Sequence, residues 1–525
     1  MLSREVDVVV VGAGTAGCVV ASRLSEDATC RVALVEAGGS DARPDVRIPG
    51  ASALLHRSSA DWKFYTEPQA KLNDRRLYYP RGKVVGGCGS TNTLIYMRGE
   101  RQDFDDWNVP GWRADDVMPF FRRAEGFRFE VDAKEQGTEG PLPIAHAPYR
   151  HPVSEVFVAA GEAAGLPRNE DFNAGSLEGV GFYQLNIASG IRQSTARAYL
   201  AKARWRSNLE VVTGAMTETL LFDGKRCVGV RIRRGRTVEE LRARREVIVS
   251  AGAIGSPALL MYSGIGPAEH LRDMGRPVVL DQPLVGARLQ DHPLLPIADR
   301  GGSRTGNTTA FDVGPALQYL ALRKGPLLVP YPAAGGFART GTSSRPDIQF
   351  HFAPAWSNNL YDVKHMPPED GYMLCVTVCR PRSRGSVRLG GSRTDDPPRI
   401  DPAFFTDEDD LDTMIRGFEL AQKILSAAPF DAIRKGPALP PERLHDPDAI
   451  ARYVRLACET TYHPIGTCRM GADASDSVVD PSLKVRGIDG LRVIDASVMP
   501  AITTGNTNAP TIMIAERGSD MIQRG

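Results

Sequence analysis

The sequence has no apolar run approaching the roughly 18 residues that suggest a membrane-spanning helix. Low-complexity tracts and short repeats are also absent, which argues against a repeat architecture. The stretch from Met1 to Asp7 runs directly into an apolar strand and leaves no room for the regions of a secretion signal. We therefore expect a cytoplasmic protein without a transmembrane segment.

Cysteine is scarce, and eight cysteines in 525 residues do not make a disulfide framework. Cys375 and Cys379 lie in a strand-like apolar run, without a second pair at the spacing of a zinc site. A small buried hydrophobic residue is the simplest interpretation of each cysteine. We expect free thiols and no metal.

The chain also has no large excess of positive or negative charge. The chain has 64 basic and 63 acidic residues, a formal net charge of +1, which gives no electrostatic reason to expect nucleic acid or an anionic membrane as partner. A small substrate fits this balance better. At 525 residues the chain is too long for one simple core, so two large domains or a core with a big insertion are expected.

The N-terminal region has the pattern of a nucleotide-binding unit. Residues 7–11 form a β-branched run, the glycine turn GAGTAG follows at 12–17, and 18–24 is helix-like. A second strand-like run, 31–35, ends at Glu36, which lies 19 positions after the last glycine of the turn. This is the spacing at which an acidic side chain meets a ribose.

Each glycine of the turn has a physical role. Gly12 permits the tight turn, Gly14 lets the backbone approach a pyrophosphate, and Gly17 allows the helix to pack closely on the strand. The helix N-terminus then faces the negative charge of the ligand. Nucleotide binding follows, but these residues alone leave NAD and FAD both open.

The C-terminal region returns to strand and helix signals after a proline-rich middle, between Asp291 and Pro447, that predicts long loops. Residues 491–494 predict a strand that ends at Asp495. Residues 512–522 predict a terminal helix with Pro510 near its first turn. This arrangement indicates a nucleotide-binding domain interrupted by an insertion.

Two long glycine-rich segments narrow the choice of nucleotide. In residues 81–92 (RGKVVGGCGSTN), adjacent glycines allow backbone contact with a planar ring, and Asn92 offers both a donor and an acceptor. Residues 252–266 (GAIGSPALLMYSGIG) follow a predicted strand, with Ser256 and Pro257 as N-cap and first residue of a helix.

These segments resemble the first and second signatures of the glucose-methanol-choline (GMC) oxidoreductases. Shorter pieces similar to the family occur in the same order, at residues 61–62, 193–196, 208–211 and 289–293. The resemblance implies FAD and an α/β fold (α+β overall), in which a split Rossmann-like FAD-binding domain carries an inserted substrate domain built on an antiparallel sheet. We assign residues 1–150, 205–296 and 455–525 to the FAD-binding domain, and 151–204 and 297–454 to the substrate domain.

The resemblance also implies which residues hold FAD. Glu36 should hold the adenosine ribose, Thr217 should lie by the adenine, and Asp495 should meet the polar chain of the flavin. The full predicted set is Gly12, Gly14, Thr15, Ala16, Gly17, Glu36, Ala37, Trp62, Val84, Gly87, Asn92, Thr93, Leu94, Ile95, Thr217, Asp495, Ala496, Asn506, Thr507 and Asn508.

Two positions of the first signature depart from the family. Cys88 stands where glycine, serine or threonine is usual, and Thr91 stands where an aliphatic residue is usual. Some members carry at the latter position a histidine that is covalently attached to FAD. Thr91 therefore predicts noncovalent FAD.

One of the nine histidines has a supporting motif. His463 lies in residues 461–471 (TYHPIGTCRMG), which resemble the family segment that carries its catalytic base. An imidazole with an ordinary pKa near 6.5 suits removal of the hydroxyl proton while hydride leaves for flavin N5. We interpret His292 as structural and His351 as a strand residue that could reach the substrate. The remaining histidines are interpreted as loop or surface residues: His56, His146, His151, His270, His365 and His445.

Residues 505–511 (GNTNAPT) match the family segment with the second catalytic position, which is histidine in some members and asparagine in others. Asn506 occupies it here, and its amide can donate a hydrogen bond to the substrate oxygen. The alternative role, capping the following helix, fits Asn508 better.

The leading hypothesis is thus FAD-dependent oxidation of a small primary or secondary alcohol, with oxygen, a quinone or another redox carrier as electron acceptor. Choline is one candidate substrate. Lyase or photodecarboxylase-type chemistry on the same fold is the alternative. A flavin-binding protein without turnover is a third hypothesis, and the presence of both His463 and Asn506 argues against it.

Overall fold

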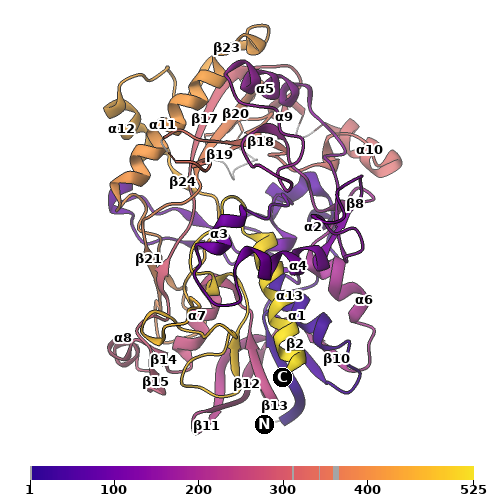
Figure 1. Cartoon of the computed structure of the whole chain (residues 1–525), viewed down its shortest axis with the longest axis vertical. Helices are drawn as coiled ribbons and strands as arrows, with labels where there is room; N and C mark the ends of the chain where they lie inside the picture. The colour runs from indigo at the N-terminus through magenta and orange to yellow at the C-terminus, as the bar shows by residue number, and fades with distance from the viewer. Residues whose placement is uncertain (1–2, 310–311, 342, 359–365) are drawn as a thin grey trace.

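Two seven-stranded sheets organise the molecule (Figure 1). The structure is a computed structural model that describes residues 3–309, 312–341, 343–358 and 366–525. Both chain ends lie beside the lower sheet in Figure 1, and the upper sheet is built largely from the middle of the chain. The predicted pairing of a Rossmann-like sheet with an antiparallel sheet is confirmed.

The lower sheet has the strand order β10-β2-β1-β13-β12-β11, and β25 pairs with the C-terminal end of β13. Its parallel part is buried on both faces, which explains why its strands have continuous valine-rich runs rather than alternating patterns. The strands are β1 (Ser3–Val11), β2 (Val32–Val35), β10 (Leu209–Val212), β11 (Met216–Asp223), β12 (Arg226–Arg234), β13 (Thr237–Val249) and β25 (Leu491–Val493).

Helix α1 (Thr15–Leu24) packs against this sheet, and helix α13 (Asn508–Arg524) packs against α1. Thr15 Oγ1 donates a hydrogen bond of 2.9 Å to Asn508 Oδ1, so the N-termini of both helices lie side by side. The prediction that α13 begins near residue 512 was wrong by one turn. Pro510 falls within the first turn, where no backbone N–H is required, so the helix begins before the apolar periodicity does.

The capping expectation for α13 was also wrong. Thr507 is the N-cap residue, and Asn508 is the first helical residue, whose side chain bonds to Thr15 instead. The first backbone N–H groups of a helix have no partner within the helix and point outward from its N-terminal end. The residues just before α13 are therefore well placed to contact a bound ligand.

The upper sheet has the order β23-β17-β20-β19-β18-β7, with β24 paired to β17, and is antiparallel throughout. The prediction of long loops between Asp291 and Pro447 was wrong, because β19 and β20 are buried on both faces and show no alternating pattern. The strands are β7 (Gly179–Phe182), β17 (Pro293–Gly301), β18 (Ala334–Ala338), β19 (Ile348–Ala353), β20 (Gly371–Val378), β23 (Arg434–Leu439) and β24 (Glu459–Thr460).

One face of the upper sheet is covered by helices α5 (Pro152–Ala163) and α11 (Glu408–Leu425). Strand β17 crosses the predicted domain boundary at residue 296, and β24 belongs to the predicted C-terminal FAD-binding segment. We propose the two-domain division with β17 placed whole in the substrate domain.

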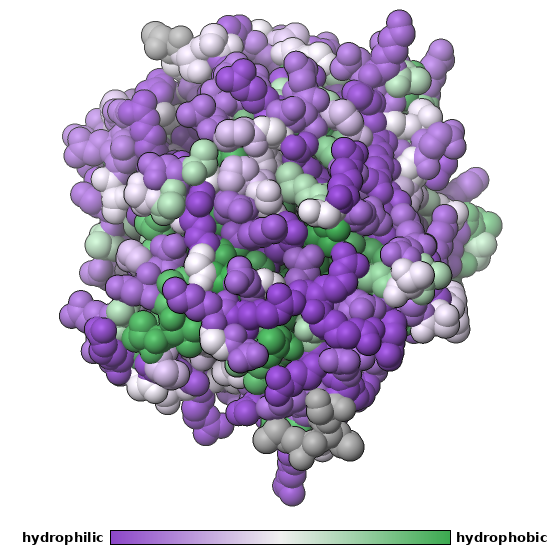
Figure 2. Space-filling view, turned by 60° about the horizontal axis from the view of Figure 1, so that its bottom comes forward, coloured by the Kyte–Doolittle hydropathy of each residue, from purple (hydrophilic) through white to green (hydrophobic). Residues whose placement is uncertain are grey.

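The cysteines, the possible metal ligands and the hydropathy of the helices and surface complete the description of the fold. All eight cysteines are free. Within the described ranges, no group of histidine, cysteine and acidic residues has the arrangement of a metal site, and no helix has the length and hydropathy needed to cross a bilayer. On the face shown in Figure 2, hydrophilic residues dominate, and hydrophobic ones appear in separate groups between them.

Candidate active site

A cavity of about 860 Å³ runs from the carboxyl ends of β1 and β2 to the upper sheet. It brings together His463 and every residue of the predicted cofactor set except Gly17 and Val84. Val84 is buried in a small cluster with Val46, Leu55 and Ala60 instead. His56 also lines the cavity, whereas His365 lies outside the described residues.

The glycine turn at one end of the cavity leaves space for a ligand. A Cβ atom on Gly12 would lie 2.5 Å from the Ser250 carbonyl oxygen, and one on Gly17 would lie 1.8 Å from the Gly12 carbonyl oxygen. Both glycines are thus required by packing. A Cβ on Gly14 would meet nothing closer than 3.9 Å, so its missing side chain instead widens the cavity.

Glu36 lies at the end of β2, with its carboxylate buried. One oxygen accepts the backbone N–H of Ala13 at 2.9 Å, and the other accepts that of Gly38 at 2.7 Å. Burial raises the pKa of Glu36 to about 7, although these hydrogen bonds oppose the shift. Thr217 also lines the cavity, and its buried Oγ1 has no hydrogen-bond partner among the described residues. Both groups fit the sugar and base of an adenosine.

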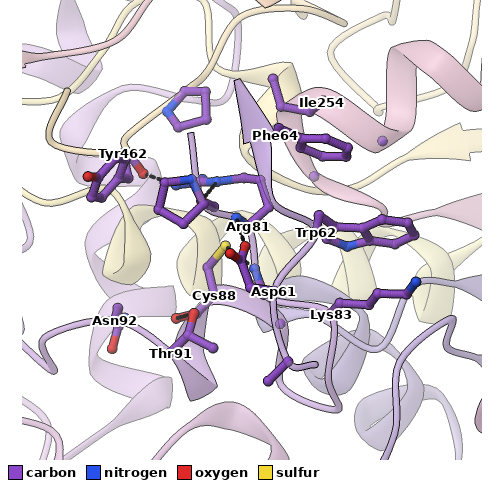
Figure 3. A pocket seen from close by; sticks show the side chains of 18 of the residues that line it. Asp61, Trp62, Phe64, Arg81, Lys83, Cys88, Thr91, Asn92, Ile254 and Tyr462 are labelled. Atoms are coloured by element: carbon purple, nitrogen blue, oxygen red, sulfur yellow. Dashed lines mark hydrogen bonds between the residues drawn. The ribbon is translucent and has the colours of Figure 1, made fainter. Parts of the chain in front are cut away.

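The segment 81–92 forms one wall of the cavity (Figure 3). Gly87 has a φ of +52°, and a Cβ there would lie 2.7 Å from Gly14 Cα, so the wall packs directly on the glycine turn. Asn92 Oδ1 accepts from the Leu94 N–H and from Arg192 Nη1, both at 3.0 Å. Its acceptor oxygen is therefore engaged, and its amide Nδ2 remains as a donor for a ligand.

Arg192 was missed by the sequence analysis, because no motif marks it. It is fully buried, and its guanidinium donates to the carbonyl oxygens of Val46 and Asn92 at 2.9 and 2.7 Å. Burial lowers its pKa to about 9. Arg192 thus holds the wall segment by bonds to backbone oxygens.

Asp495 anchors a third element, helix α7 (Gly252–Tyr262). Its Oδ2 accepts the Gly252 N–H at 2.8 Å and the Ser256 hydroxyl at 2.5 Å, and its Oδ1 accepts the Ser497 N–H at 2.8 Å. The prediction of Ser256 as N-cap was wrong, since Ala251 is the N-cap residue and the helix begins at Gly252. Ser256 instead accepts the N–H of Ala251 at 3.0 Å from inside the helix.

The two predicted catalytic residues meet on the opposite side of the cavity. Asn506 Nδ2 lies 3.2 Å from His463 Nε2, although the residues come from different segments. Gln349, on β19, donates from Nε2 to Asn506 Oδ1 at 3.1 Å. Because that oxygen accepts from Gln349, the NH₂ end of Asn506 must point toward His463.

The tautomer of His463 follows from its contact with His292. His292 Nε2 lies 2.8 Å from the Cys379 carbonyl oxygen, which can only accept, so this nitrogen carries the proton. Burial lowers the pKa of His292 to about 3, so the ring is neutral and its Nδ1 is an acceptor. His463 Nδ1, 3.0 Å away, is then the donor. The lone pair of His463 is left on Nε2, facing Asn506.

This contact gives His292 a role that its structural interpretation missed. The spacing in the chain explains why, since 171 positions separate His292 from His463. Asp291 adds a second constraint, because its Oδ1 accepts the backbone N–H of His463 at 2.7 Å. The ring and the backbone of His463 are thus both fixed.

The electrostatics keep His463 neutral. Burial is the main cause that lowers its pKa well below 6.5, and His292, His351 and Arg81 act in the same direction. His351, on β19, also lines the cavity, and burial lowers its pKa to about 4. Neither ring nitrogen of His351 has a partner among the described residues. His351 thus lies beside the cavity as expected, but its ring nitrogens are buried beneath the cavity surface.

The chain matches known proteins over nearly its whole length. Models of GMC oxidoreductases match residues 6–294 and 381–515. The chain is 39% identical to an alcohol dehydrogenase (acceptor) from Pseudomonas putida, with 99% of the chain and 96% of that protein covered. It is 38% identical to an oxygen-dependent choline dehydrogenase from Brucella ovis, with 99% and 95% covered.

Solved structures agree with these relatives. Pyridoxine 4-oxidase from Mesorbium loti matches with a TM-score of 0.89 and 32% identity, covering 99% of each chain. Formate oxidase matches with a TM-score of 0.92 and 27% identity, covering 100% of this chain and 99% of the other. The glycine turn, Glu36 and Thr217 fit the adenosine diphosphate half of such a cofactor independently of these matches. The chain belongs to the GMC oxidoreductase family and is an FAD-dependent enzyme that acts on CH–OH donors.

Proposed function

We propose that this enzyme oxidises a small primary or secondary alcohol to the carbonyl compound, with His463 as general base and Asn506 as hydrogen-bond partner of the substrate oxygen. The observation that carries the proposal is the 3.2 Å approach of Asn506 Nδ2 to the lone pair of His463 Nε2 at the cavity wall. When bound, FAD supplies the hydride acceptor, N5 of its isoalloxazine ring.

The roles of the two residues follow from the two atoms that face each other, His463 Nε2 and Asn506 Nδ2. His463 Nε2 takes the hydroxyl proton, the O–H electron pair stays on the oxygen and forms the C=O bond, and the hydride leaves the carbon. Asn506 Nδ2 donates to the oxygen as negative charge develops there. Because an amide does not titrate near neutral pH, Asn506 does not compete for the proton.

The proposed cofactor contacts place the two ends of FAD at the two ends of the cavity. Glu36 and Thr217 would hold the adenosine, and Asn92 Nδ2 and the residues preceding α13 would contact the flavin. The positive end of the α13 dipole would stabilise negative charge on the reduced ring. Asp495 contributes by fixing the start of α7, since its oxygens already bind three protein donors.

Anaerobic mixing with alcohols tests the proposal. Flavin absorbance should bleach with at least one member of a panel of aliphatic, aromatic, amino and sugar alcohols. Failure of the whole panel would favour the lyase or photodecarboxylase alternative, in which no net alcohol oxidation reduces the flavin. A second measurement, hydrogen peroxide release in air, separates oxygen from a quinone as electron acceptor.

The pH dependence should follow the neutral form of His463. Only the neutral ring can accept the proton, so flavin reduction should be fast above its pKa and fall as pH drops through it. Since burial lowers that pKa, we expect kcat/KM to stay flat from neutral pH to below 6.5, with the acidic loss at lower pH. An acidic limb centred above pH 6.5 would contradict the environment assigned to His463.

FAD should be released by acid denaturation. Thr91 lines the cavity but has no ring nitrogen that can bond to the flavin. After precipitation with acid, the yellow colour should therefore be found in the supernatant, measured by absorbance at the flavin bands. Colour retained in the washed precipitate would overturn the prediction of a noncovalent cofactor.

A further inference from the structure

The floor of the cavity beside Asn506 is one face of the upper sheet. The strand register places three rows of side chains on this face, because directly paired residues of antiparallel strands share a side. The row nearest Asn506 contains Leu294, Thr377 and Gln349, the next contains Pro296, Cys375 and His351, and the third contains Ala298, Met373 and Ala353. Five of these residues line the cavity itself: Leu294, Cys375, His351, Met373 and Ala353.

Beyond its first row this floor is apolar except for the neutral imidazole of His351 and the thiol of Cys375. Gln349 is held by Asn506, and Thr377 Oγ1 lies 3.5 Å from Thr461 Oγ1, so the polar groups gather where the substrate hydroxyl would sit. Leu294, Ala298, Met373 and Cys375 then form one buried cluster with Trp356. The indole N–H of Trp356 donates to the Glu369 carbonyl oxygen at 3.2 Å and is not free for a substrate.

No charged side chain of the described residues lies on this floor. His351 is neutral, because burial lowers its pKa to about 4, and burial raises the pKa of the Cys375 thiol to about 12. The carboxylates that do line the cavity come from other walls. Glu36 binds the glycine turn, Asp395 pairs with Arg233 at 2.8 Å, and three further acids, Asp61, Asp396 and Asp495, accept bonds from other protein groups.

We propose that the substrate is an uncharged alcohol with an apolar body, which extends from Asn506 across the floor toward Met373 and Trp356. This inference rests on the proposed function and names its substrate class. A cationic alcohol such as choline would lose its hydration on this floor without gaining an opposite charge, and a sugar would leave hydroxyl groups unpaired.

Two alcohols of the same shape test the proposal. In 3,3-dimethylbutan-1-ol a carbon atom replaces the cationic nitrogen of choline, so the pair differs in charge alone. With the FAD-loaded enzyme, the second-order rate constant of anaerobic flavin reduction should be at least about 100-fold higher for the neutral alcohol. Stopped-flow absorbance over a range of concentrations gives both constants.

Equal or faster reduction by choline would overturn the proposal, because an aromatic face such as Trp356 would then be holding the cation. The proposed function, alcohol oxidation, would still hold in that case, because choline is also an alcohol. Failure of both compounds and of the wider alcohol panel would overturn the proposed function together with this inference.

Placing a charge on the floor should weaken the preference for the neutral alcohol. Met373→Glu adds a carboxylate to the third row, and Met373→Gln has nearly the same shape without the charge. The ratio of the choline constant to the neutral-alcohol constant should rise at least about 10-fold in the Glu variant relative to the Gln variant. Equal ratios in two variants with full FAD content would overturn the placement of the substrate body at Met373.

Discussion

Replacing His463 with alanine should lower the rate of flavin reduction by roughly 10²–10⁴, the usual effect of removing a positioned acid or base. The variant removes the Nε2 lone pair that faces Asn506, and nothing within hydrogen-bond distance of that position has the same chemistry. His292 is too weak a base to replace it, because burial lowers the pKa of its ring to about 3. Stopped-flow reduction at saturating substrate measures the effect.

FAD content distinguishes a lost base from a damaged site. The variant should retain its flavin, because the predicted adenosine contacts, Glu36 and Thr217, lie at the other end of the cavity. His445→Ala serves as the control, since His445 is an exposed loop residue outside the cavity lining. Parent-like reduction by the His463 variant would show that another group accepts the proton.

The local parts of the site could be predicted from sequence because each depends on neighbouring residues. The glycine turn requires residues within six positions, and His463 and Asn506 lie in short segments that resemble the family. The bonds that orient them could not be predicted. Gln349 lies 157 positions from Asn506, and only the pairing of β19 within the upper sheet brings the two side chains together.

The fold likewise has one part that could be predicted from the sequence and one part that could not. The parallel strands β1 and β2 are separated by one glycine turn and one helix, so their order could be inferred from the chain. For the upper sheet, the runs around His351 and Cys375 could be recognised as strand-like, but the pairing of the strands could not be derived. Its central strands are buried on both faces, and a run without alternation does not identify its neighbours in the sheet.

Asn506→Ala should slow flavin reduction by up to about 10²–10³, the effect of removing one donor to an oxygen on which charge develops. Gln349 fixes the amide so that its NH₂ end faces His463 Nε2, and the substrate hydroxyl must enter beside both atoms to lose its proton there. The loss should appear mainly in the limiting rate, because the donor acts on developing charge rather than on the neutral alcohol.

Asn506→His separates this role from packing. Histidine retains an N–H donor and occurs at this position in other family members, so the variant should keep part of the activity that alanine loses. FAD content must be measured for both variants, since Thr507 and Asn508 line the same cavity and a displaced α13 terminus would release the flavin. If Asn506→Ala reduces its flavin at the parent limiting rate, the side chain acts only by packing against Gln349, and His463 Nε2 is the sole group that acts on the hydroxyl.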